Sequence, residues 1–347
     1  MGDLRVLIID SSPVYKKILR LAAADLDKNA ALTCVDNGNE ALDNIKRNNY
    51  DVFVIDIDAS GLDAGELLKV ITREIPKALV LVTARASSIS EKLCAEAVAK
   101  GAFDCMIKPV YSSYSENYDA VKQKLSDIFK IVYDKREKKD EQSGVEPVKA
   151  KKTQAENVFR PKIVLIAVST GGPLALENIF TKLRGDFPVP VLVVQHIPPQ
   201  FTEHLARHLN QKSQLSVKVA ENGEPIVAGT VYIAPGGMHM KLNAENEILL
   251  DDSPPLNGIR PAADALFESV AESFTEPVLA VILTGMGSDG KNGLAALKEK
   301  RDCFCLAQSE DTCVVYGMPR AAVESGLADK VLDVDKISAE MESLILF

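Results

Sequence analysis

Three polar residues with the side chains of a nucleophilic enzyme each follow an apolar run of the sequence. Ser169 follows IVLIAV, His196 ends VLVVQH, and Asp289 lies in the turn GMGSDG behind PVLAVILT. A serine hydroxyl needs a base to take its proton, and an imidazole base needs a carboxylate to orient it. If the apolar runs are parallel strands, their carboxyl ends share one edge of a sheet. The pattern therefore predicts a Ser-His-Asp hydrolase with nucleophile, general base and orienting acid in that order.

The surroundings of Ser169 also fit a simpler role at the start of a helix. Gly171 and Gly172 permit a tight turn, and Pro173 suits the first turn of a helix. Serine is favoured immediately before helices whatever its chemistry, so helix capping explains AVSTGGP by itself. The turn contains neither a G-x-S-x-G elbow nor a G-x-G-x-x-G fingerprint. A nucleotide-binding turn is the weakest interpretation, because no phosphate-binding lysine accompanies the glycines.

The chain has four histidines from which a base could come. His196 is the first choice, because it ends an apolar strand just before Ile197-Pro198-Pro199. His239, in APGGMHM, is the second choice, because its segment is not an evident parallel strand. His204 and His208 have helical i, i+4 spacing without the intervening Glu of HExxH, so a solvated helix face is expected rather than a metal site.

Four further polar residues end apolar runs in the first half of the chain. Asp10 follows RVLII, Asp56 follows DVFVI, Thr83 follows LVLV, and Lys108 follows FDCMI. One carboxylate could hold a hard cation, and a second could accept a phosphoryl group. The hydroxyl and the ammonium group could then bind the phosphoryl oxygens.

The elements that must position these residues form an α/β pattern. Short apolar runs alternate with amphipathic stretches in both halves, which predicts parallel sheets covered by helices on both faces. A length of 347 residues favours two domains. We expect a first domain over residues 1–133, with its last helix around Glu116 to Tyr133. A charged linker over 134–158 follows; a solvated, over-long helix is the alternative there, and Gly144 and Pro147 disfavour it. The second domain covers 159–347, and the stretch VYIAPGGMHMKLNAENEILLDD predicts a hairpin insertion.

Composition and charge exclude several classes of protein. The formal net charge of −9 argues against binding to a nucleic-acid backbone, which requires clustered Lys and Arg. No run of eighteen uncharged apolar residues occurs, so we expect a cytoplasmic protein that is not inserted in a membrane. The six cysteines lack a repeated CxxC spacing and are expected to be buried thiols in a reducing compartment.

Residues 3 to about 133 resemble a bacterial receiver domain on the four strand-end residues described above. The resemblance implies a flavodoxin-like, doubly wound sheet in which a histidine kinase phosphorylates Asp56. It further implies that Asp10 and Asp56 hold Mg²⁺, and that Thr83 and Lys108 sense the phosphoryl group. Ser11 stands where the family usually has a second acid, so weaker Mg²⁺ binding is expected.

Two further positions depart from the receiver pattern. Ala59-Ser60 stands where a Met-Pro pair is common, and Cys105 takes the usual place of an aromatic switch residue. These departures keep open a second interpretation of the whole chain. In it, the chain is a docking or regulatory protein whose receiver answers a signal other than phosphate.

Residues of about 160 to 335 resemble the catalytic domain of the chemotaxis protein-glutamate methylesterases, the CheB family. The resemblance rests on six motifs in order: AVSTGGP, QHIPPQFT, IAPGGMHM, RPAADALF, LTGMGSDG and CVVYGMPR. It implies a Rossmann-like domain that hydrolyses glutamate methyl esters on chemoreceptors, often deamidates receptor glutamines, and needs no metal for ester hydrolysis. Ser169, His196 and Asp289 match the family's triad. Backbone N–H groups near Thr170 and Met286 are the expected donors to the oxyanion.

Overall fold

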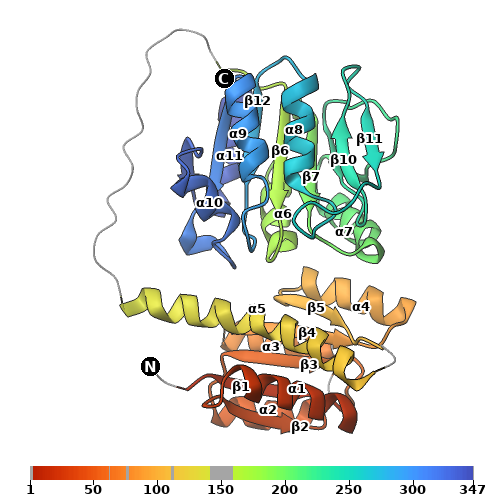
Figure 1. Cartoon of the computed structure of the whole chain (residues 1–347), viewed down its shortest axis with the longest axis vertical. Coiled ribbons are helices and arrows are strands. Elements are labelled where there is room, and N and C mark those ends of the chain that lie inside the picture. The colour runs from red at the N-terminus through yellow and green to blue at the C-terminus, as the bar shows by residue number, and fades with distance from the viewer. Residues whose placement is uncertain (1–2, 62, 76–77, 111–112, 141–158, 347) are drawn as a thin grey trace. The chain divides into compact units, whose positions relative to one another are not determined.

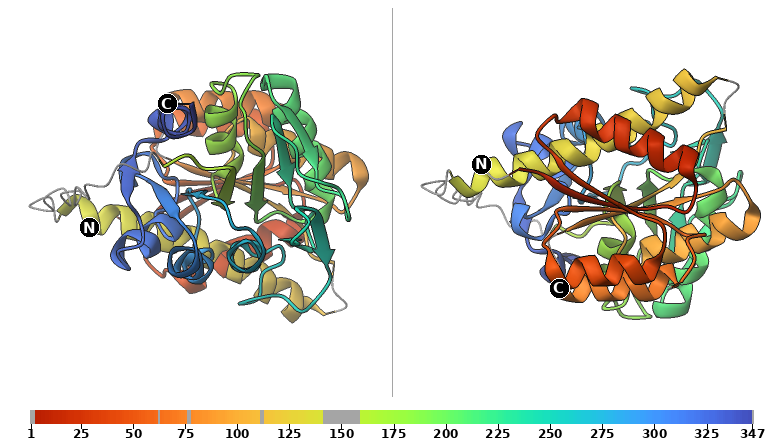
Figure 2. Two further views of the ribbon diagram at one scale, coloured as in Figure 1. Left: turned by 90° about the horizontal axis from the view of Figure 1, so that it is seen from above. Right: turned by 90° about the horizontal axis from the view of Figure 1, so that it is seen from below.

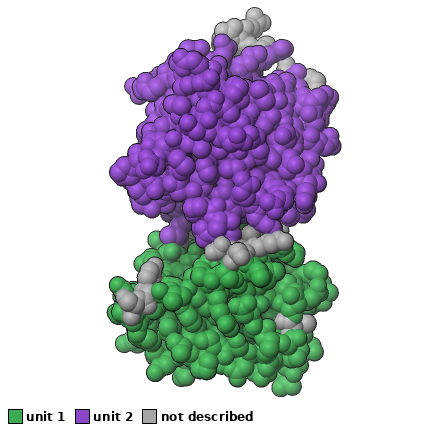
Figure 3. All heavy atoms as spheres, turned by 90° about the vertical axis from the view of Figure 1, so that its right-hand side faces the viewer, with its two compact units in different colours: residues 1–147 green, residues 148–347 purple. Residues whose placement is uncertain are grey.

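The computed structural model describes residues 3–61, 63–75, 78–110, 113–140 and 159–346. The chain divides into two compact units, Met1–Pro147 and Val148–Phe347, which are coloured separately in Figure 3. No described helix is long and apolar enough to cross a membrane.

The first unit is a parallel sheet of five strands in the order β2-β1-β3-β4-β5 (Figure 1). Its strands are β1 (Arg5–Ile9), β2 (Ala31–Val35), β3 (Val52–Asp56), β4 (Leu79–Ala84) and β5 (Asp104–Ile107). Its helices are α1 (Pro13–Leu26), α2 (Gly38–Arg47), α3 (Ala64–Glu74), α4 (Ser88–Ala99) and α5 (Tyr114–Asp140). Helices α1 and α5 cover one face of the sheet and α2 and α3 the other (Figure 2). This strand order is flavodoxin-like, which confirms the expected fold.

Helices α1 to α4 begin where the sequence supplies a capping side chain. The caps Ser12, Asn37 and Ser87 each accept a hydrogen bond from the backbone N–H three residues ahead, and Asp63 accepts from the N–H groups two and three residues ahead. Such caps satisfy N–H groups that have no partner within the helix. They fix where the loops at the carboxyl edge of the sheet end.

Two features of the first unit differ from expectation. Helix α5 continues to Asp140, past the expected end of the domain at Tyr133, and the remaining expected linker residues, 141–158, lie outside the described residues. Cys94 on α4 and Cys105 on β5 have Cα atoms 5.8 Å apart and form a disulfide, so the prediction of six thiols is wrong for this pair. The reason is that α4 packs directly on β5, a contact that sequence spacing does not reveal. Cys34, Cys303 and Cys305 are free thiols.

The second unit contains a parallel sheet of seven strands in the order β14-β13-β12-β6-β7-β9-β8 (Figure 1). Its strands are β6 (Ile163–Val168), β7 (Val191–Gln195), β8 (Ser216–Val219), β9 (Thr230–Ile233), β12 (Val278–Ile282), β13 (Cys303–Gln308) and β14 (Lys330–Leu332). The chain moves outward from β6 through β7 and later returns to the other side of β6 with β12. This reversal is a topological switch point, where doubly wound sheets bind ligands at the carboxyl ends of their strands.

Helices cover both faces of this sheet (Figure 2). One core contains side chains of α6 (Gly172–Phe180), α7 (Pro199–Lys212) and α11 (Val334–Leu346). The core on the opposite face contains α8 (Ala263–Ser273), α9 (Lys291–Lys300) and α10 (Met318–Glu324). The strands β6, β7 and β12 are buried on both sides, which explains why their sequences are continuous apolar runs.

The expected hairpin insertion is present but shorter than the sequence suggested. Strands β10 (His239–Leu242) and β11 (Ile248–Asp251) pair antiparallel as a separate two-stranded sheet. Thr230–Ile233, the first part of the expected hairpin region, is β9 and joins the parallel sheet between β7 and β8. Four apolar and β-branched residues suit either kind of strand, so the sequence pattern alone could not choose the partner.

Candidate active site and phosphoacceptor site

Ser169 opens a tight turn between β6 and α6. The carbonyl of Ser169 accepts a hydrogen bond from Gly172 N at 2.9 Å, and Gly171 has φ 79° and ψ 0°. These angles define a type II turn, which requires a residue that tolerates positive φ at its third position. A Cβ on Gly171 would also lie 2.5 Å from Val314 Cγ2. Glycine at 171 therefore shapes the turn that leaves the Ser169 side chain at the carboxyl edge of the sheet.

His196 and Asp289 form a close pair at the same edge. His196 Nε2 lies 2.7 Å from Asp289 Oδ2, and the two side chains are 12% and 5% exposed. His196 N donates to Val168 O at 3.0 Å, which places the base beside the end of the strand that carries the nucleophile. The bond from Nε2 to the carboxylate leaves Nδ1 as the ring nitrogen that can take a proton from serine.

The Asp289 carboxylate is held in place by backbone donors from α8. Asp289 Oδ2 also accepts from Ala263 N at 2.6 Å, and Oδ1 accepts from Asp264 N at 3.0 Å. Burial raises the pKa of Asp289, but the hydrogen bond and charge of His196 and the two backbone N–H groups outweigh burial and lower it. The carboxylate is therefore charged at neutral pH and can stabilise an imidazolium beside it.

The predicted triad residues converge on one edge of the sheet. Ser169 N donates to Thr284 O at 3.0 Å. A Cβ on Gly285 would lie 2.7 Å from Ser169 Cβ, so the turn after β12 lies directly beside the nucleophile. Among the described residues, no hydrogen bond joins the Ser169 hydroxyl to the imidazole of His196. This contact is commonly long in enzymes without substrate and shortens when substrate binds.

Backbone N–H groups near Thr170 and Met286 were expected to receive the oxyanion. Within the described parts of the chain, neither N–H group donates a hydrogen bond. The Thr284 hydroxyl donates to Thr170 O at 2.9 Å, and Gly285 N donates to Val315 O at 3.0 Å. These hydrogen bonds hold the turn after β6 and the turn after β12 in place. Unbonded N–H groups on fixed turns are the donors that oxyanion stabilisation requires.

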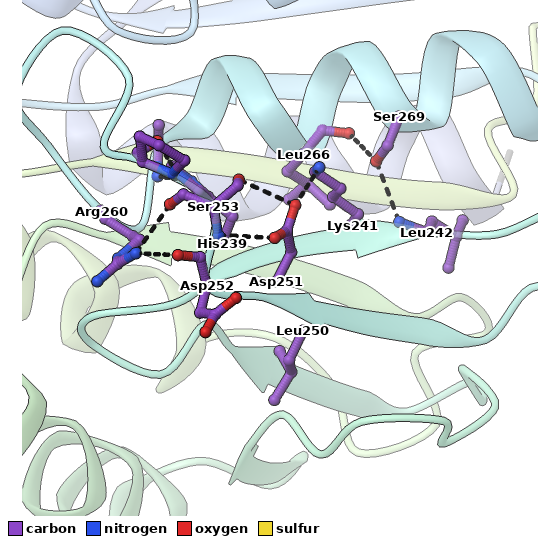
Figure 4. Close-up of polar contacts among 12 residues, drawn as sticks. His239, Lys241, Leu242, Leu250, Asp251, Asp252, Ser253, Arg260, Leu266 and Ser269 are labelled. Atoms are coloured by element: carbon purple, nitrogen blue, oxygen red, sulfur yellow. Dashed lines mark hydrogen bonds and ion pairs between the residues drawn. The ribbon is translucent and has the colours of Figure 1, made fainter.

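The other histidines lie away from this cluster. The rival base His239 is 1% exposed, its Nδ1 accepts from Ala262 N at 3.2 Å, and its Nε2 lies 3.3 Å from Pro254 O (Figure 4). It therefore supports the segment that leads into α8. His208 Nε2 is 2.7 Å from Glu177 Oε2 on the neighbouring helix, in keeping with a helix-face role. Among the described residues, no three His, Cys, Asp or Glu side chains form a potential metal site.

Figure 4 also shows how the segment between β11 and α8 is held. Asp251 pairs with Lys241 and accepts from Ser253 N at 2.7 Å. Arg260 Nη1 donates to the carbonyls of Asp252 and Ser253. These contacts anchor the segment that leads into α8, whose first residues supply the N–H donors to Asp289.

Asp264 is a buried carboxylate next to the triad that sequence reasoning did not single out. It is 3% exposed, and its Oδ1 accepts from Gly293 N at 2.8 Å in the first turn of α9. Burial, and to a smaller extent the charge of Asp289, raise its pKa above the ordinary value for Asp. The turn before α9, GMGSDG, has G-x-G-x-x-G spacing, which the sequence analysis did not weigh.

The four strand-end residues of the first unit also converge. Lys108 Nζ lies 2.8 Å from Asp10 Oδ2 and 2.9 Å from Asp56 Oδ2, and all three side chains are buried. Burial raises the pKa of Asp56, and the charge of Asp10 adds to the rise, while Lys108 opposes it. The Thr83 hydroxyl is fully buried and has no hydrogen-bond partner among the residues that the structure describes. An acceptor bound at Asp56 would satisfy it.

Comparison with known proteins gives the same two domains. A family model described as CheB methylesterase matches residues 164–341, and one described as response regulator receiver domain matches residues 6–115. A protein-glutamate methylesterase/protein-glutamine glutaminase of Desulfotalea psychrophila is 36% identical over 98% of each chain. One of Syntrophomonas wolfei is 37% identical over 98% of this chain and 99% of its own.

A solved structure resembles the second unit. The crystal structure of the CheB methylesterase catalytic domain of Thermotoga maritima is 44% identical, covers 53% of this chain and 99% of its own, and superposes with a TM-score of 0.51. The match extends the likeness from sequence to three-dimensional fold.

Proposed function

The chain belongs to the CheB methylesterase family, and from that membership we propose that Ser169, His196 and Asp289 are the residues with which it hydrolyses glutamate methyl esters of chemoreceptors. The observation that carries the assignment is the 2.7 Å contact between His196 and an Asp289 carboxylate held by two backbone N–H groups. The interpretation as a docking protein without catalysis is not favoured, because relatives named as enzymes match nearly the whole chain.

The first half of the reaction transfers the glutamyl group to Ser169. His196 Nδ1 takes the hydroxyl proton as Oγ attacks the ester carbonyl carbon, and the carbonyl oxygen becomes an oxyanion. The N–H groups of Thr170 and Met286 receive that charge, and Asp289 stabilises the imidazolium. The intermediate collapses, the C–O bond to the methoxy group breaks, and His196 returns its proton to the departing methanol.

The second half restores the enzyme with water. His196 takes a proton from a water molecule as the water oxygen attacks the acyl carbon. The bond between that carbon and Ser169 Oγ then breaks, and the imidazolium of His196 reprotonates the serine. The products are a glutamate side chain and methanol. The same site acting on a receptor glutamine would release ammonia in the first half, and we propose this deamidation as a second reaction.

Methanol release tests the activity. We expect the full-length protein to release methanol from a methylated chemoreceptor fragment and to leave an unmethylated fragment unchanged. His196→Ala is expected to lose most of this release while keeping its fold, because the imidazole is only partly buried. If methanol release is absent, or is equal in His196→Ala, the proposal is wrong.

We further propose that the receiver domain controls the activity through phosphorylation of Asp56. A chemotaxis histidine kinase is the expected phosphodonor, and the cytoplasm, where the kinase and the receptor helices are accessible, is the expected location. Thr83 and Lys108 are suited to bind the phosphoryl oxygens, because the Thr83 hydroxyl has no partner within the described parts of the chain and the Lys108 ammonium group already faces Asp56.

Mg²⁺ is the cation that this reaction needs, and Asp10 and Asp56 would hold it. Mg²⁺ commonly binds through one or two carboxylates together with water and phosphate oxygens, so two carboxylates beside a partnerless hydroxyl fit. When bound, the ion would neutralise charge on the phosphoryl group. Incubation with acetyl phosphate and Mg²⁺, followed by intact mass measurement, should add one phosphate to the protein and none to Asp56→Asn. No addition to either protein would refute this control mechanism.

A further inference from the structure

One buried amide contacts the backbone of both the nucleophile and the base. Gln195 is the last residue of β7 and is 2% exposed. Its Nε2 lies 2.9 Å from Ser169 O and 3.1 Å from His196 O, and donates to both. An amide nitrogen has two N–H donors, so this contact uses both of them.

The side chain of Gln195 lies beneath the first residue of α6. A Cβ on Gly172 would overlap Gln195 Oε1, so glycine at 172 leaves room for the amide. Along β7, alternate residues Val191 and Val193 belong to the same apolar core as α6, and Gln195 continues that face. The sheet therefore places a polar side chain where the pattern of the strand calls for an apolar one.

This placement is unfavourable for stability taken alone. Among the described residues, Gln195 Oε1 is buried without a hydrogen-bond partner, and a buried acceptor without a partner destabilises the fold. An apolar side chain of similar size would avoid that cost. The amide is therefore better explained by what its nitrogen holds than by packing.

We propose that Gln195 is a positioning residue for ester hydrolysis, whose amide fixes the separation between the nucleophile and the base. Ser169 and His196 follow different strands, β6 and β7, and each leaves its strand into a turn. The amide joins their two carbonyls across the gap. Ser169 O has a second donor in Gly172 N, whereas the described residues offer His196 O none. Loss of the amide thus leaves the His196 carbonyl without a described donor, and the base is then held by its N–H bond to Val168 O and by Asp289. The inference rests on the proposed esterase function.

Gln195→Met tests the role by removing both donors while keeping the length of the side chain. Because a shift of about 1 Å in a catalytic group costs about 10²-fold, we expect kcat to fall by roughly 10- to 100-fold. KM should stay nearly constant, because Gln195 is buried and does not touch substrate. Ser213→Ala is the control: it removes bonds to Leu215 N and Phe180 O at the far end of α7. This control should lower stability and leave kcat unchanged.

Gln195→Glu adds a readout that a purely structural role would not move. Burial among carbonyl oxygens raises the pKa of the introduced carboxyl. When protonated it can donate to one carbonyl, and when ionised it repels both. The ratio of its kcat to that of the unsubstituted protein should therefore fall as pH rises. If Gln195→Met does not fold, this profile alone decides the question.

The outcomes separate this inference from the proposed function. If His196→Ala loses methanol release but Gln195→Met keeps the original kcat, or the Gln195→Glu ratio does not vary with pH, the positioning role is refuted and the esterase assignment stands. If His196→Ala and the unsubstituted protein release methanol equally, the esterase assignment itself fails.

Discussion

Asp289→Asn should slow ester hydrolysis by an amount that the geometry around the carboxylate determines. Oδ2 accepts from His196 Nε2 at 2.7 Å and from Ala263 N at 2.6 Å, while Oδ1 accepts from Asp264 N at 3.0 Å. Asparagine has only one acceptor oxygen. With that oxygen in the Oδ2 position the side chain keeps two of the three bonds, and in the opposite orientation it keeps one. The first orientation is therefore preferred, and His196 keeps its tautomer.

The expected loss is then electrostatic. A unit charge about 4 Å from the imidazolium is worth about 4 kcal/mol at an effective dielectric constant near 20. Each 1.36 kcal/mol changes a rate tenfold, so kcat should fall by about 10³. The wrong tautomer would give the larger loss of about 10⁴ that is typical when an orienting aspartate becomes asparagine. The amide NH₂ facing Asp264 N should also lower the free energy of unfolding by about 1 to 3 kcal/mol.

The assay is methanol release at saturating methylated receptor fragment, with urea unfolding measured in parallel. Asp264→Asn is the matched control, because it is a buried neighbour whose amide oxygen can keep the bond from Gly293 N and which has no contact with His196. Its kcat should stay close to that of the unsubstituted protein. A fall of less than about tenfold for Asp289→Asn would refute the role of the charge. A fall well beyond 10³ would refute the preferred orientation of the amide.

Three further outcomes are expected. Gly171→Ala puts alanine at a positive φ and its Cβ 2.5 Å from Val314 Cγ2. It should lower the free energy of unfolding by about 1 to 3 kcal/mol, and an unchanged urea midpoint would contradict the conformation described for this turn. Lys108→Met leaves two buried carboxylates unpaired and should cost about 3 to 5 kcal/mol, which the urea transition of the first unit would show; an unaltered transition would exclude the buried ion pair. The hydrogen bond from Lys241 lowers the pKa of Asp251, so this stabilisation is present above the ordinary carboxyl pKa of about 4 and is lost as pH falls below it. The melting temperature should therefore fall more steeply with acid in the unsubstituted protein than in Asp251→Asn, and parallel curves would argue against the pair.

The positions of the triad could be predicted because each residue ends a continuous apolar run. Parallel strands that are buried on both faces leave such runs, and their carboxyl ends lie together by geometry. The same reasoning located Asp10, Asp56, Thr83 and Lys108. For these residues the order of strands and helices along the chain was enough to predict their positions at the edge of the sheet.

The residues that support the triad could not be predicted in this way. Gln195 contacts Ser169 and Asp264 contacts Gly293 through tertiary contacts between segments that are distant in sequence, and these spacings have no regular period. A buried glutamine at the end of an otherwise apolar strand was the one available signal. The pairing of β9 and the contact between Cys94 and Cys105 likewise depend on which elements pack together.

The most direct test of the account is the rate of methanol release by Ser169→Ala. Alanine keeps the backbone bonds of residue 169 and removes only the hydroxyl, so the site should stay assembled. Loss of a serine nucleophile typically costs about 10⁴-fold or more in kcat, and we predict a loss of that size. Methanol release by Ser169→Ala at the rate of the unsubstituted protein would contradict the assignment of Ser169 as the nucleophile.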